Sequence, residues 1–278
     1  MRVVGGIGVP HTPHFPPIVD SNADGADALR RLYGELRAQL ESMSPDVIVF
    51  FSSDHYNLFF AESVPIFSVG VADTAWGPSD YDLQRYEVRL DAPLGRVLQE
   101  RLVSAGFDVG RTREFELDHP FTIPLHFLVP GMDIPIVPFW ISAFMRPLPG
   151  AGRCVALGTA VREILESLED NRRVVVIGTG SFSLEIGGPR MSAASHTGVP
   201  APGWVDRVVE LMSVADLDAL IGEATDEQLW EAGNAGGEVL LWLTMLATLP
   251  GPPRPAFLEA QHAFGHAYGA WPTERLSA

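Results

Sequence analysis

The sequence predicts an α/β fold: a single domain over residues 1–278, with a mixed, mostly parallel central sheet flanked by helices. Short apolar runs typical of buried strands alternate along the chain with longer segments whose leucines recur at helical spacing. The 27 glycines and 23 prolines are spread through the connections and do not gather into a linker. A length of 278 residues and a hydrophobic fraction of 46% are ample for one large core.

The first half of the chain predicts two strands and two helices in alternation. Residues 3–9 are β-rich and predict a strand that ends at a proline. Residues 23–43 predict a helix, since leucines recur there at spacings of three and four, and a proline follows it. Residues 46–52 predict a strand buried on both faces, because the run is apolar throughout its middle. A proline and a glycine bracket a helix at residues 94–105.

The second half continues the alternation and ends mostly in helices. The strand expected at residues 134–141 contains Pro135 and Pro138, which indicate an edge strand or a bulge. An amphipathic helix at residues 153–168 leads into a strand at residues 173–178. Further helices are expected at residues 204–212, 215–221 and 234–249, and the tail at residues 255–268 is expected to return to strand.

The chain is strongly acidic, with 19 basic and 35 acidic residues and a formal net charge of −16. Such a charge repels phosphate backbones and anionic head groups, so we expect no nucleic-acid partner and no membrane partner. The apolar amino terminus is too short for a signal peptide, and no run reaches the roughly 18 apolar residues of a membrane helix. The longest candidate, residues 239–249, stops at Pro250. We therefore expect a cytoplasmic protein.

Eight histidines against a single cysteine, Cys154, restrict the metal chemistry. One thiol builds neither an intrachain disulfide framework nor a thiolate cage for zinc or iron–sulfur, and it fits a reducing cytosol. Cys154 opens a helix among apolar neighbours, so we expect a buried and inert thiol. Any metal in this protein would have imidazole and carboxylate ligands.

Two histidines lie directly after predicted strands. His11 follows the first strand in the run GVPH, and His55 follows the second in the run SSDH. In α/β folds the chemistry sits in loops at the carboxyl ends of strands, so both imidazoles can reach one cleft. For each histidine taken alone, a solvated loop side chain is the alternative.

Glu238 is a lone carboxylate that opens an otherwise apolar helix, directly after Gly236 and Gly237. An ionised carboxylate rarely enters such surroundings without a partner, and paired glycines let the backbone approach another group closely. Alternatively, the carboxylate caps the helix or favours the positive end of its dipole. With His11 and His55 it would complete the two-histidine, one-carboxylate set that suits non-haem Fe(II), if the three converge.

Six motifs, in register over most of the chain, resemble the class III extradiol ring-cleaving dioxygenases, the superfamily of the catalytic β subunit of protocatechuate 4,5-dioxygenase. In chain order they are GVPHTP, PDVIVFFSSDH, DHPFTIPL, PIVPFWIS, VVVIGTGS and GNAGGEVLLWL. Each motif alone is weak, and the six together are specific. The resemblance implies an α/β fold, Fe(II) held by His11, His55 and Glu238, and a catechol and O2 as substrates that meet at the metal.

The family contains members with and without a small separate subunit. A homo-oligomer and a separate small subunit are therefore both compatible with the sequence. An apolar face on the helix that contains residues 239–249 would serve a dimer as easily as a core.

The chain departs from the family at Leu184. The family motif after the third core strand is GTGGLSH, whose histidine is the acid/base group, whereas this chain reads GTGSFSL. We place Leu184 in the substrate-binding site, where it cannot move a proton. Three accounts remain: another group (His119, Glu185 or His196) takes over, the substrate needs no strong base, or the protein has left the family reaction while keeping its iron.

His119 is the first choice for the catalytic acid/base, because it lies in a matched motif with its backbone restrained before a proline. A packed or capping histidine is the alternative. Arg190, in the run GGPR beside the active-site loop, is a candidate partner for a substrate carboxylate, with a surface arginine as the alternative. His14 could orient the ligands. The other three, His126, His262 and His266, are expected to be structural.

The leading hypothesis is an Fe(II)-dependent extradiol-type dioxygenase that cleaves the ring of a catechol or related hydroxylated aromatic with O2. A metal-binding, non-catalytic paralogue or subunit is one alternative, and a metal-dependent hydrolase on the same scaffold is the other. The run GTG at residues 178–180 lacks a third glycine at the right spacing, which argues against a dinucleotide cofactor.

Overall fold

The computed structural model describes residues 1–78, 83–191, 197–251 and 254–273. The strands of its central sheet are β1 (Arg2–Val9), β2 (Val47–Ser52), β3 (Phe67–Gly70), β6 (Val109–Thr112), β7 (Ile136–Ile141), β8 (Arg173–Thr179), β11 (Phe257–Gln261) and β12 (His266–Pro272). Two short hairpins lie outside it: β4 (Thr74–Gly77) with β5 (Tyr86–Arg89), and β9 (Glu185–Ile186) with β10 (Thr197–Gly198).

The helices are α1 (Phe15–Asp20), α2 (Ala26–Met43), α3 (Ala92–Ser104), α4 (His119–Leu128), α5 (Ala151–Glu166), α6 (Pro202–Val214), α7 (Leu217–Glu223), α8 (Asp226–Glu231) and α9 (Val239–Thr248). Two 3₁₀ turns, η1 (Gly236–Glu238) and η2 (His262–Phe264), precede α9 and β12. Helix α3 begins where the sequence places a proline, and the Asp91 carboxylate caps it by accepting the N–H of Leu94.

The sheet has the strand order β11-β12-β1-β8-β2-β7-β3-β6. Its parallel pairs are β1–β8, β8–β2, β2–β7 and β3–β6, and the remaining three pairs are antiparallel. The predicted α/β fold, with a mixed, mostly parallel sheet flanked by helices, is confirmed. Every residue of β2 is buried, as expected for a central strand covered on both faces.

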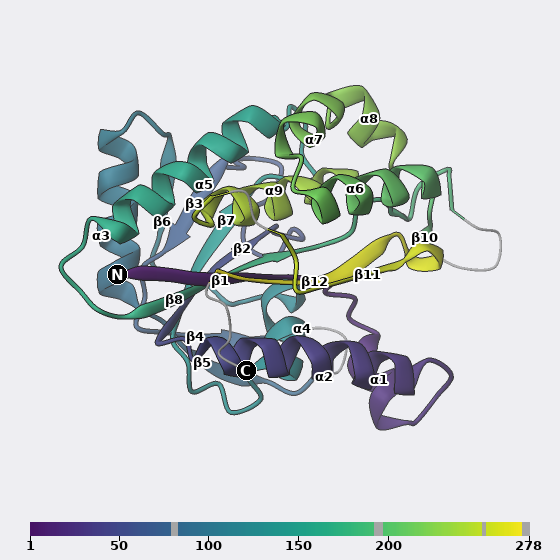
Figure 1. Ribbon diagram of the computed structural model, residues 1–278, viewed down its shortest axis with the longest axis horizontal. Coiled ribbons are helices and arrows are strands. Elements are labelled where there is room, and N and C mark those ends of the chain that lie inside the picture. Colours follow the sequence, from purple (N-terminus) through teal and green to yellow (C-terminus); the bar gives the residue numbers. More distant parts are fainter. Residues whose placement is uncertain (79–82, 192–196, 252–253, 274–278) are drawn as a thin grey trace.

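Helices cover both faces of the sheet, so the protein has three layers (Figure 1). Helices α5, α6 and α9 lie over one face, and their apolar side chains share a core with those of α3 and α7. Helices α1, α2 and α4 lie over the other face and form a second core. Cys154 on α5 is a free, fully buried thiol, as the sequence indicates.

Strand β7 corrects one expectation, since its prolines do not place it at an edge. It lies between β2 and β3 in the interior of the sheet. The antiparallel register with β3 begins at Phe139, opposite Val69, so Pro138 precedes that ladder and its missing N–H breaks none of its pairs. On the other side, Pro135 uses its carbonyl, which accepts the N–H of Ile48.

Helix α9 corrects a second expectation, because it offers no apolar face to a dimer. All ten of its residues are buried, and it packs against α5 and β8 inside the subunit. The turn η1 replaces the first residues of the helix expected at residues 234–249. Within the described ranges, no helix combines the length and the apolar character needed to span a bilayer.

Candidate metal centre

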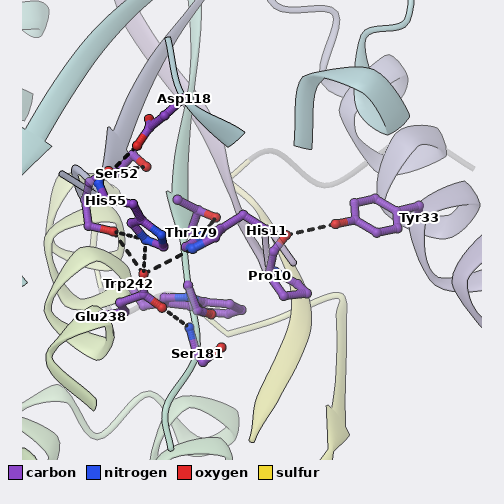
Figure 2. A network of polar contacts seen from close by, with 12 residues as sticks. Pro10, His11, Tyr33, Ser52, His55, Asp118, Thr179, Ser181, Glu238 and Trp242 are labelled. Atoms are coloured by element: carbon purple, nitrogen blue, oxygen red, sulfur yellow. Dashed lines mark hydrogen bonds and ion pairs between the residues drawn. The ribbon is translucent and has the colours of Figure 1, made fainter. Parts of the chain in front are cut away.

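The candidate site lies at the carboxyl edge of the sheet, where β1, β8 and β2 are neighbours. His11 comes two residues after β1, Thr179 ends β8, and His55 comes three residues after β2. Because parallel strands end at the same edge, side chains far apart in the sequence meet there. Figure 2 shows these side chains gathered around Glu238, which is the last residue of η1.

One oxygen of Glu238 is the point of convergence. Its Oε1 atom lies 3.2 Å from Nε2 of His11 and 3.3 Å from Nε2 of His55. The Ser53 hydroxyl donates to the same oxygen at 2.9 Å, and the backbone N–H of Ser181 donates to Oε2 at 2.8 Å. The three residues that the sequence suggests as ligands therefore lie in contact with one another.

Burial changes the pKa values of this cluster, since Glu238 is only 1% exposed. Burial raises the pKa of its carboxyl group, but the charges and hydrogen bonds of His11 and His55 outweigh burial and hold that pKa well below its ordinary value. Burial also lowers the pKa of His55, against the opposing hydrogen bond to Glu238. An ionised carboxylate facing two imidazole nitrogens is a donor set that suits a metal cation with nitrogen and oxygen ligands.

The second ring nitrogen of His11 is also engaged. Nδ1 lies 2.8 Å from the hydroxyl oxygen of Thr179, and Nε2 is the nitrogen that faces Glu238. Metal-binding histidines usually hydrogen-bond through their other ring nitrogen, which sets the ring orientation. Thr179, Ser53 and Ser181 are missing from the sequence-based site, because a hydroxyl residue near the end of a strand carries no specific signal in the sequence.

Glycines allow the backbone to approach this cluster closely, as the sequence suggests for Gly237. Gly180 has a φ of +121°, and a Cβ there would lie 2.5 Å from the Cβ of Glu238. A Cβ on Gly237 would lie 2.2 Å from the carbonyl oxygen of Ala143. The Glu238 side chain thus packs against bare backbone, and the turn that carries it packs against the loop after β7.

His119, the predicted acid/base residue, begins α4 and is 4% exposed. Its ring centroid lies 4.6 Å from that of His55 and 5.8 Å from that of His11. One nitrogen from each of these three rings lies within 4.8 Å of the others, so a three-histidine set is a second candidate for holding a metal. Asp118 accepts the backbone N–H of His55 at 3.0 Å and thereby ties α4 to the loop after β2.

Leu184 is held beside the turn that leads to Glu238. Its carbonyl oxygen accepts the N–H of Ala235 at 3.0 Å, and a Cβ on Gly233 would lie 2.1 Å from the same oxygen. The side chain of Leu184 is half-buried. The backbone at this position is therefore coupled to the segment that positions the carboxylate.

Glu185 and Arg190 pair with each other at 2.9 Å. Glu185 also accepts the backbone N–H of Asn234 at 2.9 Å. Arg190 donates to the carbonyl of Trp230 at 2.6 Å, and its guanidinium lies 5.2 Å from the centre of that indole ring. Both candidate side chains are thus engaged by the protein itself, and the other alternative, His196, lies outside the described residues.

Three further histidines lie on other parts of the molecule. His14 is exposed at the start of α1. His126 is half-buried near the end of α4, where it shares a hydrogen bond with the hydroxyl of Tyr86. His262 is exposed and pairs with Asp206 at 2.7 Å.

His266 is a buried histidine at the start of β12. That strand is antiparallel to β1 and pairs Gly269 with Gly8, so it begins near the loop that carries His11. Burial, with the charge of His11 adding to it, lowers the pKa of His266 to about 3. Its ring packs edge-on against Phe15, consistent with the structural role expected from the sequence.

A shallow hollow that is open to solvent lies beside His55, between the loops that follow β2 and β7. The ring of Phe144, in its lining, meets the ring of His55 edge-on at 4.6 Å. Asp54 is among the residues that line the same hollow, and its carboxylate accepts the N–H groups of Leu58 and Phe59 at 2.9 and 3.0 Å. Burial raises the pKa of Asp54, and these two hydrogen bonds oppose that effect.

A buried cluster of histidines and a carboxylate at the carboxyl edge of an α/β sheet is an arrangement that suits a metal-dependent enzyme. Residues 5–270 match the family described as the catalytic LigB subunit of aromatic ring-opening dioxygenase. The chain belongs to this family, and it is accordingly an oxidoreductase of the dioxygenase type.

Relatives at modest identity carry a consistent name. The 2,3-dihydroxyphenylpropionate/2,3-dihydroxicinnamic acid 1,2-dioxygenase of Klebsiella pneumoniae subsp. pneumoniae is 27% identical over 278 aligned residues, covering 86% of this chain and 87% of that protein. The protein of the same name from Escherichia coli O139:H28 is 31% identical over 184 residues, covering 65% of this chain and 57% of that protein. An uncharacterized Escherichia coli K12 protein of known crystal structure has the same fold, with a TM-score of 0.63 at 16% identity over 96% of this chain and 98% of its own.

Proposed function

We propose that this protein is a non-haem Fe(II)-dependent extradiol dioxygenase that cleaves the ring of a catechol or related hydroxylated aromatic with O2. Membership of a family of ring-opening dioxygenases supports an aromatic substrate and O2. The relatives are named for substrates with two neighbouring ring hydroxyls, which supports a catechol. The observation that carries the proposal is the convergence of His11 and His55 on one oxygen of Glu238.

His11, His55 and Glu238 would hold the metal. Their donor atoms converge in a buried site, and two imidazoles with one carboxylate are the set used by non-haem Fe(II) oxygenases, with coordination positions left open. Bound Fe(II) would supply a common binding point for the diol and O2 and a route for electrons between them. The carboxylate set is favoured over the three-histidine set because two imidazoles with one carboxylate are the set that suits non-haem Fe(II), and His119 is then assigned to the substrate.

His119 would serve as the acid/base group. Ring cleavage requires that a catechol hydroxyl lose a proton and that a proton be returned later in the reaction. An imidazole suits both tasks because its ordinary pKa is near neutral. Leu184 would line the substrate site as an apolar group where the family carries its histidine.

Arg190 as a partner of a substrate carboxylate stays a prediction, and its ion pair with Glu185 would have to exchange for the substrate. The proposal also includes one catalytic domain over residues 1–278 and action in the cytoplasm, which the single cysteine supports. A small aromatic compound and O2 are the proposed partners.

The test is reconstitution with Fe(II) under anaerobic conditions, followed by addition of catechols, protocatechuate, gallate and aminophenols and admission of air. Ring-fission absorbance with stoichiometric O2 uptake is the expected result. Iron-loaded protein that gives neither signal across the panel would contradict the proposal and point to a non-catalytic metal-binding paralogue. Hydrolytic activity that needs no O2 would instead point to a metal-dependent hydrolase.

A further inference from the structure

The hollow between the loops after β2 and β7 lies next to His55, one of the candidate ligands, through the lining residue Phe144. Asp54, on its wall, precedes His55 in the chain, and Phe144 contacts the His55 ring. A 4-substituted catechol bound through its two hydroxyls would carry its substituent on the side of the ring away from the metal. A substituent directed past His55 would enter this hollow and contact its lining.

The lining is aromatic and carries one negative charge. Among the described residues that form it, Asp54 is the sole charged side chain, and the aromatic members are Tyr56, Phe59, Trp140 and Phe144. A carboxylate beside aromatic faces attracts a cation, through the ion pair and through the negative faces of the rings. The same lining repels a carboxylate on a substrate, and it contains no cationic side chain that could pair with that carboxylate.

Asp54 is already oriented for this task. Its Oδ1 atom accepts the N–H of Leu58 at 2.9 Å, and its Oδ2 atom accepts the N–H of Phe59 at 3.0 Å. These bonds fix the carboxylate in the loop after β2, and each oxygen keeps a second lone pair for a ligand. A fixed acceptor loses little conformational entropy when a ligand binds.

The arginines nearest in sequence are occupied elsewhere. All 19 basic residues of the chain are arginines. Arg146, which follows the lining residue Met145, lies 5.1 Å from the centre of the Trp230 ring and 3.6 Å from the carboxylate of Asp226. The guanidinium of Arg190 lies 5.2 Å from the centre of the same Trp230 ring, and it pairs with Glu185.

We propose that the substrate of this enzyme is a catechol whose side chain carries a positive charge, such as an ammonium group, bound by Asp54 and the aromatic wall beside His55. This inference rests on the proposed function for the catechol and goes beyond it for the side chain. It also separates this chain from its relatives, which are named for substrates that carry a carboxylate.

The test compares three catechols that share one ring pattern on the Fe(II)-loaded wild-type protein: dopamine, neutral 4-ethylcatechol and 3-(3,4-dihydroxyphenyl)propionate. We expect kcat/KM for dopamine to exceed that for the propionate by at least about tenfold, the effect of one favourable contact of roughly 1.4 kcal/mol. Equal values, or a preference for the propionate, would overturn the inference.

A second arm assigns the preference to Asp54. Asp54→Asn removes the charge and keeps one of the two side-chain acceptors that the loop uses, and we expect the dopamine-to-propionate ratio to fall about tenfold, in line with the loss of the charged contact. The matched control is Asp20→Asn, an exposed carboxylate in a separate hollow beside α1 and α4, where the ratio should stay unchanged. A ratio that survives Asp54→Asn, or that falls equally in both variants, would overturn the assignment.

A binding measurement separates this inference from the proposed function. Calorimetric titration of the metal-free protein with phenethylamine and with 3-phenylpropionate needs neither iron nor turnover. Tighter binding of the amine supports the inference even if no catechol is cleaved, in which case the proposed function alone has failed. Tighter binding of the propionate overturns the inference even if all three catechols are cleaved.

Discussion

The hydroxyl of Thr179 lies 2.8 Å from Nδ1 of His11, and both side chains are buried. This contact joins the end of β8 to the loop after β1, two segments that the parallel sheet places side by side. With Nδ1 engaged, His11 presents Nε2 to Glu238. If His11 is a metal ligand, as proposed, the contact with Thr179 would determine which imidazole nitrogen it offers to the metal.

Thr179→Val, which removes this hydroxyl at nearly constant volume, should weaken metal binding about 10- to 100-fold, the usual cost of losing such a partner. Competition with a chromophoric chelator under anaerobic conditions measures the affinity. Thr179→Ser should recover most of it. The control is Thr248→Val, because that buried hydroxyl bonds only the Thr244 carbonyl within α9; an equal loss there would contradict the assignment.

Gly180→Ala should disrupt the metal centre as well as strain the fold. The added methyl would lie 2.5 Å from the Cβ of Glu238, and Gly180 has a positive φ that alanine adopts only with strain. We expect metal affinity to fall at least about tenfold as the carboxylate is displaced, with a destabilisation of about 1–3 kcal/mol. Gly106→Ala, at a φ of +91° with open space around it, is the control for strain alone. Equal metal affinity in the two variants would refute this account.

Leu184→His tests whether the missing imidazole limits turnover. The backbone there is anchored to Ala235, so the new side chain starts from a fixed position beside the turn that carries Glu238. Activity on simple catechols should rise by at least about tenfold, toward the range of roughly 100- to 10,000-fold that acid–base catalysis contributes. Metal affinity, measured in parallel, should not change. Unaltered turnover would contradict the view that the missing imidazole at this position limits turnover, and would leave His119 as the proposed base.

Cys154 should make stability fall at alkaline pH. Burial raises the pKa of its thiol from 9.0 to about 12, so between these values the folded chain keeps a proton that the unfolded chain releases. The stabilisation is complete below about pH 9 and is lost as pH rises toward 12. Urea unfolding of the wild type and Cys154→Ala at pH 8 to 10.5 measures the difference. A constant difference between the two proteins across this range would contradict the buried-thiol pKa.

The order of strands and helices follows from the sequence because the apolar periodicities are strong. The expected strand at residues 46–52 and the leucine-patterned helix before it appear within a few residues of their bounds as β2 and α2. The position of β7 did not follow, because a proline is excluded only where its missing N–H would face a partner, and the register with β3 begins just after Pro138.

In the candidate site too, the residues that the sequence identified are those with an unusual local setting, and the residues that it missed are those whose contacts depend on the strand order. His11, His55 and Glu238 stand out because polar residues after apolar strands, or within an apolar helix, need a reason to be there. Thr179 and Ser53 do not stand out in the sequence, since a hydroxyl side chain near the end of a strand is common and needs no functional explanation. Their contacts depend on the strand order β1-β8-β2, which no local pattern specifies.

Metal titration of two variants tests the central claim most directly, because the structure offers two overlapping ligand sets that share His11 and His55. We predict that His119→Ala binds one Fe(II) with nearly wild-type affinity under anaerobic conditions and loses ring cleavage. We predict that Glu238→Ala loses Fe(II) binding. Retention of iron by Glu238→Ala together with its loss from His119→Ala would contradict the account and assign the metal to the three histidines.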